Sequence, residues 1–288
     1  MWSIEEVSPT VHTMRIDYIP NKDWEFRILL TADEHVDHQD SDVRLIKKHM
    51  AKALRLRYPN VKLGDFLCAM QGKNDPRRSR LALKERFNTK EEYFDTLVDY
   101  AEEFLLPYKD IYAMQVLGNH ELSVLKHNET NLANRIVQRL RKQGSPVCLG
   151  GYQGYLKLVF SQKGGQRGKR VIIKYSHGKG GKAEVTRGVI DTNRRAVKFP
   201  DAHIMVSGHT HDAYVVPIAQ ERVSSKGKLR NMEQLHVSVP SYKDSVLDKT
   251  KGYEVEAEFG LKPVGAYWLE FWWDKDSEMI KYDARRVR

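Results

Sequence analysis

Residues 204–211 read Ile204-Met205-Val206-Ser207-Gly208-His209-Thr210-His211. The first four residues favour a strand, and two histidines separated by one residue follow it directly. Histidines in a packed core rarely alternate with polar residues in this way. Because binding sites in open α/β sheets form just beyond the carboxyl ends of strands, this stretch predicts a ligand site at a strand end.

Four earlier strand-like runs end in residues of the same kind. Their ends read Ala32-Asp33-Glu34-His35, Gly64-Asp65, Gly118-Asn119-His120-Glu121 and Ser176-His177-Gly178. Asp and His bind divalent transition ions, and one carboxylate can bridge two ions. Glycine precedes the ligand-type residue at three of the five strand ends, which allows backbone and ligand to approach closely. The five strand ends together predict a metal site assembled from distant segments.

The spacing inside two of these stretches predicts how the ligands point. In an extended chain, side chains two residues apart lie on the same face. Asp33 and His35 would then bind an ion from one side, and so would His209 and His211. A single Asp-x-His is usually structural, so the metal interpretation depends on the joint occurrence of all five stretches.

The remaining patterns predict a layered α/β fold. Strand-like runs cover 11–18, 26–31, 61–63, 111–117, 155–160, 171–175, 204–207, 214–218, 234–238 and 266–272. Helical periodicity covers 42–56, 90–106 and 131–141. Strands and helices alternate in the first half and strands crowd together later, which predicts that the second half contributes antiparallel strands.

Composition and charge narrow the class of protein. The 288 residues are 41% hydrophobic and 30% charged, which is ordinary for a globular protein and excludes a disordered, collagenous or disulfide-scaffold chain. The net charge of +10 favours a polyanionic partner, with nucleic acid first and a phosphorylated small molecule next. A basic protein without such a partner is the alternative.

We expect a cytoplasmic protein with no membrane partner. No apolar run approaches the roughly 20 residues of a membrane helix, and the first residues lack the apolar core of a signal peptide. Cys68 and Cys148 form no CxxC pair, which is typical of reduced, structural thiols. The oligomeric state is left open.

The chain resembles the calcineurin-like metallophosphoesterase family, on its phosphodiesterase and nuclease side. The resemblance is carried by Asp33-x-His35, Gly64-Asp65, Gly118-Asn119-His120-Glu121, His177-Gly178 and Gly208-His209-Thr210-His211. It implies an α/β fold built as a two-sheet αββα sandwich flanked by helices. We expect one catalytic domain over 1–288, with 1–25 as an N-terminal extension and 212–288 completing the second sheet without a separate cap domain.

By this resemblance, seven side chains would hold two divalent metal ions. Asp33, His35 and His211 would bind the first ion, Asn119, His177 and His209 the second, and Asp65 would bridge both. His120 would protonate the leaving oxygen or stabilise the transition state, and Glu121 would orient His120 or cap a helix. The implied reaction is hydrolysis by a metal-bound hydroxide. Manganese is the first expectation, and iron, zinc or nickel are alternatives.

The same motifs leave the substrate class open. The Gly-His-Thr-His ending resembles phosphodiesterases and nucleases. Protein phosphatases of the family carry Gly-Asp-x-Val-Asp-Arg-Gly, whose arginine is missing from Gly64-Asp65-Phe66-Leu67-Cys68. Gly-Asn-His-Glu resembles the phosphatase version, and nucleases often place His where Cys68 stands. A phosphodiesterase acting on nucleic acid or nucleotides is the first hypothesis. A phosphomonoesterase of small molecules or phosphoproteins, or a nucleic-acid-binding protein with a degenerate site, are the alternatives.

Basic stretches supply candidate substrate contacts. Lys73, Arg77 and Arg78 follow the second strand end, and arginine matches phosphate geometry. A solvated helix start is the alternative for this loop. The basic residues of 163–182, 222–230 and 285–288 could extend a polyanion track, with solvated hairpin loops as the favoured alternative. For the tryptophans of 266–273, core packing is favoured over base stacking.

Overall fold

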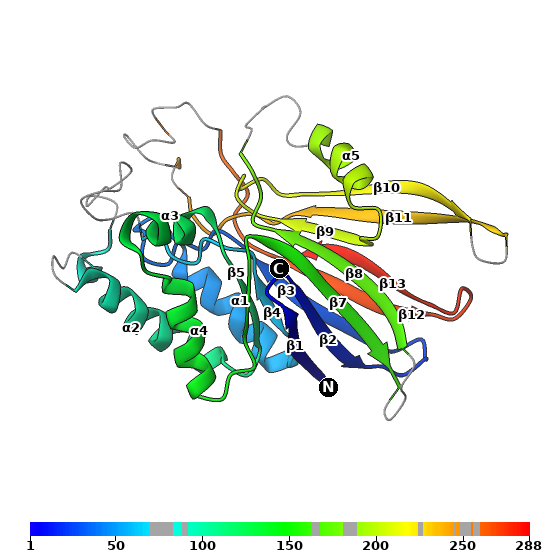
Figure 1. Ribbon diagram of the computed structural model, residues 1–288, viewed down its shortest axis with the longest axis horizontal. Coiled ribbons are helices and arrows are strands. Elements are labelled where there is room, and N and C mark those ends of the chain that lie inside the picture. The colour runs from blue at the N-terminus through cyan, green and yellow to red at the C-terminus, as the bar shows by residue number, and fades with distance from the viewer. Residues whose placement is uncertain are drawn as a thin grey trace.

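A computed structural model describes residues 1–69, 83–87, 92–162, 168–180, 189–223, 227–244, 246–247, 255 and 260–288. Within these residues the chain forms two β-sheets and a set of helices (Figure 1). No helix in these ranges is both long and apolar enough to span a bilayer.

The two sheets have different strand orders. The seven-stranded sheet runs β1 (Trp2–Ser8), β2 (Val11–Asp17), β7 (Gln153–Ser161), β8 (Gly168–Ser176), β9 (Ile204–Ser207), β11 (Leu229–Ser238) and β10 (Tyr214–Val223). The six-stranded sheet runs β13 (Met279–Arg286), β12 (Tyr267–Asp274), β3 (Glu25–Thr31), β4 (Asn60–Lys62), β5 (Tyr112–Val116) and β6 (Cys148–Gly150). The helices are α1 (Val43–Leu56), α2 (Tyr93–Leu105), α3 (Asn119–Asn128), α4 (Leu132–Lys142) and α5 (Val189–Lys198), with the short 3₁₀ turns η2 (Glu85–Phe87) and η3 (Leu106–Tyr108).

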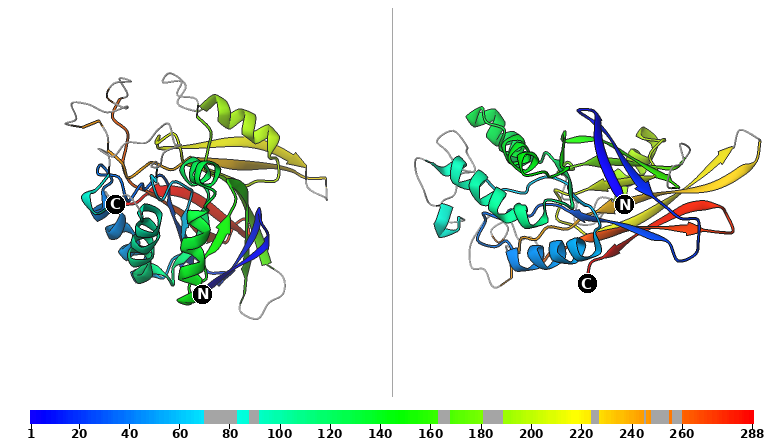
Figure 2. Two further views of the ribbon diagram at one scale, coloured as in Figure 1. Left: turned by 60° about the vertical axis from the view of Figure 1, so that its left-hand side comes forward. Right: turned by 90° about the horizontal axis from the view of Figure 1, so that it is seen from below.

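The six-stranded sheet is buried on both faces, as β3 illustrates. Ile28 and Leu30 point into the apolar core between the two sheets, where they meet residues such as Leu158 of β7. Leu29 points the other way, into a second core formed with helices α1, α2 and α4. Helix α5 packs against β10, on the other sheet (Figure 2). This confirms the predicted α/β fold of two sheets flanked by helices.

All the predicted strands and helices are present, with boundaries shifted by a few residues. The prediction missed β1, β6, β13, α3 and α5. It was wrong in placing 266–272 in the same sheet as 214–218 and 234–238, because β12 pairs antiparallel with β3. β12 is apolar on both faces, with Leu269 in the core between the sheets and Trp268 under the helices. β9 of the seven-stranded sheet is also buried along its whole length, so the apolar pattern alone does not assign β12 to one sheet.

The N-terminal residues form a hairpin at one edge of the seven-stranded sheet. β1 pairs antiparallel with β2, and β2 pairs in parallel with β7. Trp268 is 2% exposed and packs on Tyr58, as core packing predicts, and Trp273 packs on Tyr18. Trp272 is 39% exposed.

Parallel pairing brings the five motif-bearing strand ends to one region. β3, β4 and β5 run parallel to one another in the six-stranded sheet. β8 and β9 run parallel in the seven-stranded sheet. Because the carboxyl ends of parallel strands lie at the same edge, the loops that follow these strands face each other across the two sheets.

Two histidines in the folded core predict how stability depends on pH. Burial, helped by Lys48, lowers the pKa of His49 to about 4, and burial with Arg195 lowers the pKa of His236 to about 4. The unfolded chain, with a histidine pKa near 6.5, binds more protons between these values, so stability falls as the pH falls from about 6.5 to 4. We expect His49→Gln and His236→Gln each to flatten this slope in urea unfolding measured across that range. An unchanged slope in the double variant would contradict the prediction.

Candidate metal centre

The loops after the strands bring the candidate ligands together through unusual backbone conformations. Asp33, His35, Asp65, His209 and His211 all have positive φ, between 44° and 72°. Non-glycine residues rarely adopt this left-handed region, and strain of this kind concentrates at functional sites. The extended Asp-x-His geometry predicted from the sequence is therefore wrong, because these residues lie in tight turns beyond the strands.

Two glycines make these turns possible. Gly64 has φ of +96°, and a Cβ there would meet Nδ1 of His177 at 2.5 Å. A Cβ on Gly208 would meet Oδ2 of Asp33 at 2.5 Å. Side chains at these positions would collide with the ligands themselves, as the sequence pattern of glycine before ligand predicts.

One group of donor atoms consists of Asp33, His35 and His211, whose ligand atoms lie within 4.8 Å of one another. Oδ2 of Asp33 accepts a hydrogen bond from the backbone N–H of His209 at 2.8 Å. Oδ1 is buried, accepts no hydrogen bond from the described residues, and lies 3.4 Å from Nε2 of His211. A buried carboxylate oxygen that accepts no hydrogen bond in the described part of the chain fits a bound cation.

A second group consists of Asp65, His177 and His209, again within 4.8 Å. The amide oxygen of Asn119 contacts Nε2 of His177 at 2.9 Å and Nδ1 of His209 at 2.8 Å, so Asn119 belongs with them. Nδ1 of His177 donates to the Leu63 carbonyl at 2.7 Å. This bond fixes the ring and directs Nε2 into the site, as backbone carbonyls do for metal-binding histidines. His209 and His211 thus face different groups, contrary to the prediction of a shared side.

The protonation states of the candidate ligands are set by burial and by their mutual charges. Burial opposes the charging of His177, but Asp65 and Asp33 outweigh it and raise its pKa to about 10. Burial also opposes ionisation of Asp65, yet His120 and His177 hold its pKa well below the usual range. Burial, together with His120, lowers the pKa of His35 well below its usual value and keeps the ring neutral, which is the form that binds metals. The N and O donors present therefore fit divalent ions such as manganese, iron, zinc or nickel.

His120 lies at the start of α3 and is held at three points. Its backbone N–H donates to Oδ1 of Asp65 at 2.9 Å, and its Nδ1 bonds to the Cys68 carbonyl at 2.7 Å. Nε2 lies 3.7 Å from Oδ2 of Asp65. The ring is half-buried, with one nitrogen directed toward the second group.

Glu121 is a capping residue whose role extends beyond its own helix. Its carboxylate accepts from the backbone N–H of Gly118 at 2.8 Å and from those of Asp65 and Phe66 at 3.0 Å each. Burial and the nearby Asp65 raise its pKa to about 8. The sequence offered capping or orientation of His120 as alternatives; the structure favours capping, because the Cys68 carbonyl orients His120.

Sequence reasoning missed a buried ion pair behind the first group. Nζ of Lys62 donates to Oε1 of Glu34 at 2.6 Å, and both side chains are 1% exposed. Glu34 lies between two candidate ligands in the chain, and the pair therefore ties their loop to β4. Its signal in the sequence is a lysine between the apolar residues Val61 and Leu63.

The predicted substrate contacts Lys73, Arg77 and Arg78 lie outside the described residues, as do 163–167 and 181–182 of the basic stretch 163–182. The described part of that region includes Lys169, whose ammonium lies over the ring of Trp273.

No family model matches the chain, and no curated protein matches its sequence. Solved structures do resemble its fold. Wild-type Vps29 from Entamoeba histolytica in complex with zinc is 11% identical, with 91% of this chain and 99% of that chain covered and a TM-score of 0.37. A metallophosphoesterase from Sphaerobacter thermophilus is 12% identical, with 92% and 88% covered and a TM-score of 0.35. GAP50 of Plasmodium is 12% identical, with 92% and 89% covered and a TM-score of 0.39. Likeness at this level transfers neither activity nor ligand to this chain.

Substituting one member of the buried Glu34–Lys62 ion pair should destabilise the fold more than substituting both. Removing one charge leaves the other buried and uncompensated, so we expect Lys62→Met to lower the free energy of unfolding by about 3–5 kcal/mol. The double variant Glu34→Gln, Lys62→Met should recover part of that loss in urea denaturation. A double variant no more stable than Lys62→Met would contradict this account.

Metal binding should be visible as stabilisation of the fold. Manganese at about 100 times its Kd should raise the free energy of unfolding by about 2.7 kcal/mol. We expect Asp33→Asn to lose most of this gain in thermal unfolding with and without manganese. The matched control Asp110→Asn, at an exposed carboxylate before β5, should keep it. No manganese-dependent shift in the unaltered protein would refute the metal centre.

Proposed function

We propose that this chain is a metal-dependent phosphoesterase of the calcineurin-like metallophosphoesterase type, which hydrolyses phosphodiester bonds in nucleic acid or nucleotides. The observation that carries the proposal is the convergence of two donor groups, Asp33–His35–His211 and Asp65–His177–His209, at the ends of strands from both sheets. The two groups coincide with the two ligand sets that the motif resemblance implies.

The first group would hold one divalent ion, and the second group with Asn119 would hold the other. Two such ions supply activation of a water molecule and neutralisation of the phosphoryl charge. We propose Asp65 as the shared ligand: Oδ1 is anchored by the His120 N–H, which leaves Oδ2 facing the site, 3.1 Å from Nε2 of His177.

His120 is proposed to donate the proton that the leaving oxygen needs. Its bond to the Cys68 carbonyl places the Nδ1 proton away from the site and keeps Nε2 directed into it. A positioned acid of this kind contributes about 10²–10⁴-fold to a rate. Because the His120 ring is already held in place, no further ordering of the acid is needed during the reaction.

The preference for diesters rests on two observations. The net charge of +10 favours a polyanionic substrate, and the Gly208-His209-Thr210-His211 ending resembles diesterases more than protein phosphatases. The alternative, a phosphomonoesterase, shares the same site. Lys73, Arg77 and Arg78 remain proposed phosphate contacts. The cytoplasmic location likewise stays a prediction.

The test is hydrolysis of a chromogenic phosphodiester and its matching monoester in the presence of manganese. We expect turnover of the diester, its loss in Asp65→Asn, and a decrease of about 10²–10⁴-fold in kcat in His120→Gln. Asp110→Asn again serves as the control that keeps its activity. Preference for the monoester would favour the phosphatase, and absence of turnover on both esters and on labelled DNA and RNA would refute the proposal.

A further inference from the structure

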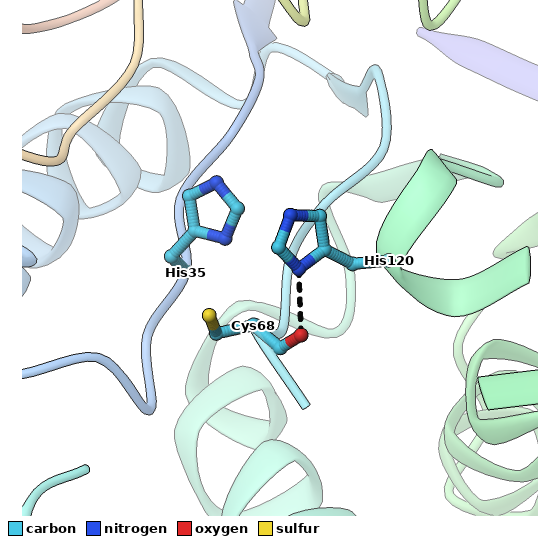
Figure 3. A group of neighbouring side chains, drawn as sticks. All are labelled: His35, Cys68 and His120. Carbon is cyan, nitrogen blue, oxygen red and sulfur yellow. Dashed lines mark hydrogen bonds between the residues drawn. The ribbon is translucent and has the colours of Figure 1, made fainter. Parts of the chain in front are cut away.

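A third group of donor atoms lies beside the two already described. The ligand atoms of His35, Cys68 and His120 lie within 4.8 Å of one another, and the side chains come from three separate segments (Figure 3). His35 follows β3, Cys68 follows β4, and His120 belongs to the first turn of α3. The proposed hydrolysis uses the backbone carbonyl of Cys68 but gives its sulfur no part.

The three side chains are arranged around a common space. The rings of His35 and His120 have centroids 4.7 Å apart and an interplanar angle of 66°. Figure 3 shows the Cys68 sulfur on the His35 side of the group, and one ring nitrogen of His35 directed toward the other two residues. Nδ1 of His35 is buried without a hydrogen-bond partner among the described residues, and the side chain is 3% exposed.

Hydrogen bonds to the side chain of Asp37 hold the backbone around Cys68 in place. Oδ1 of the buried Asp37 accepts from the Cys68 N–H at 2.6 Å, and Oδ2 accepts from the Ala69 N–H at 2.9 Å. Ala69 has φ of 48°, so the chain turns sharply directly after the cysteine. Cys68 itself is 5% exposed and forms no disulfide.

A thiolate with two imidazoles is a ligand set typical of zinc and of softer cations. Manganese prefers harder oxygen-rich sites, whereas sulfur selects thiophilic ions. A tetrahedral ion at about 2.0–2.3 Å from its ligands holds the ligand atoms roughly 3.4–3.8 Å apart. Side-chain rotations that move the donor atoms by about 1 Å would therefore close this group around an ion.

We propose that His35, Cys68 and His120 form an additional site for a thiophilic divalent cation such as zinc or cadmium, and that filling it inhibits the enzyme. The thiol proton passes to solvent as the thiolate binds. Figure 3 shows Nδ1 of His120 as the ring nitrogen on the Cys68 side, so the ion would take Nδ1, release its proton to solvent and replace the hydrogen bond that positions the ring. It would also draw His35 away from the Asp33–His211 group. The proposed binding of the cation is independent of the proposed function, whereas the proposed inhibition rests on it.

Cadmium is the probe for binding, because its thiolate complexes absorb in the ultraviolet. The chain has two cysteines, so Cys148→Ser is a matched control for Cys68→Ser. We expect the thiolate absorption in the unaltered protein and in Cys148→Ser, and its loss in Cys68→Ser. X-ray absorption of the cadmium-loaded unaltered protein should place one sulfur in the metal shell. The absence of that sulfur would overturn the proposal without any variant.

Inhibition is measured against the manganese-supported diester hydrolysis of each variant. Cys68→Ser should need more than about tenfold more cadmium for half-inhibition than Cys148→Ser, since even outer-shell partners change metal affinity by about 10–100-fold. Equal sensitivity of the two variants would overturn the inhibitory role. Turnover without the thiolate signal would refute this site alone. The signal without turnover of either ester or of labelled DNA and RNA would refute the proposed function and leave the site standing.

Discussion

The hydrogen bonds of Asp33 hold the two sheets together at the point where their strands end. Oδ2 accepts from the His209 N–H beyond β9, and the Asp33 backbone N–H donates to the Gly64 carbonyl beyond β4. Its carbonyl accepts from the Ser241 hydroxyl. One residue therefore fixes three loops, and its second carboxylate oxygen is left to face the neighbouring histidines. Asp33 is itself a member of the first donor group, and its bond to the His209 N–H holds a member of the second.

The fold was largely predictable because its strands and three of its helices have strong apolar periodicity. The exceptions have physical explanations. α3 buries only Glu121 and Val124, so its sequence has little apolar periodicity. β13 is rich in charged residues, with Ile280 as its one fully buried residue, and β6 has only three residues. The sheet to which β12 belongs could not be predicted, because the pattern gives burial on two faces but not the neighbouring strand.

The kinds of residue in the site were also predictable, but their directions were not. The motifs identified the donors that the structure brings together, since ligand types after strands are a local signal. The left-handed turns at Asp33, His35 and His211 depend on contacts between distant loops, which no local pattern contains. The same holds for two hydrogen bonds at the backbone of Cys68. Its carbonyl bonds to the ring of His120, and its N–H donates to the carboxylate of Asp37, and both partners are distant in sequence.

The three backbone bonds accepted by Glu121 have a consequence for how such chains can vary. Its carboxylate joins the first turn of α3 to the loop that carries Asp65, so the length of this side chain sets the spacing between two segments 55 residues apart. An aspartate here would be one methylene too short to reach both. A chain with the shorter acid at this position would keep all three bonds only if the turn at 64–66 moved closer to the helix.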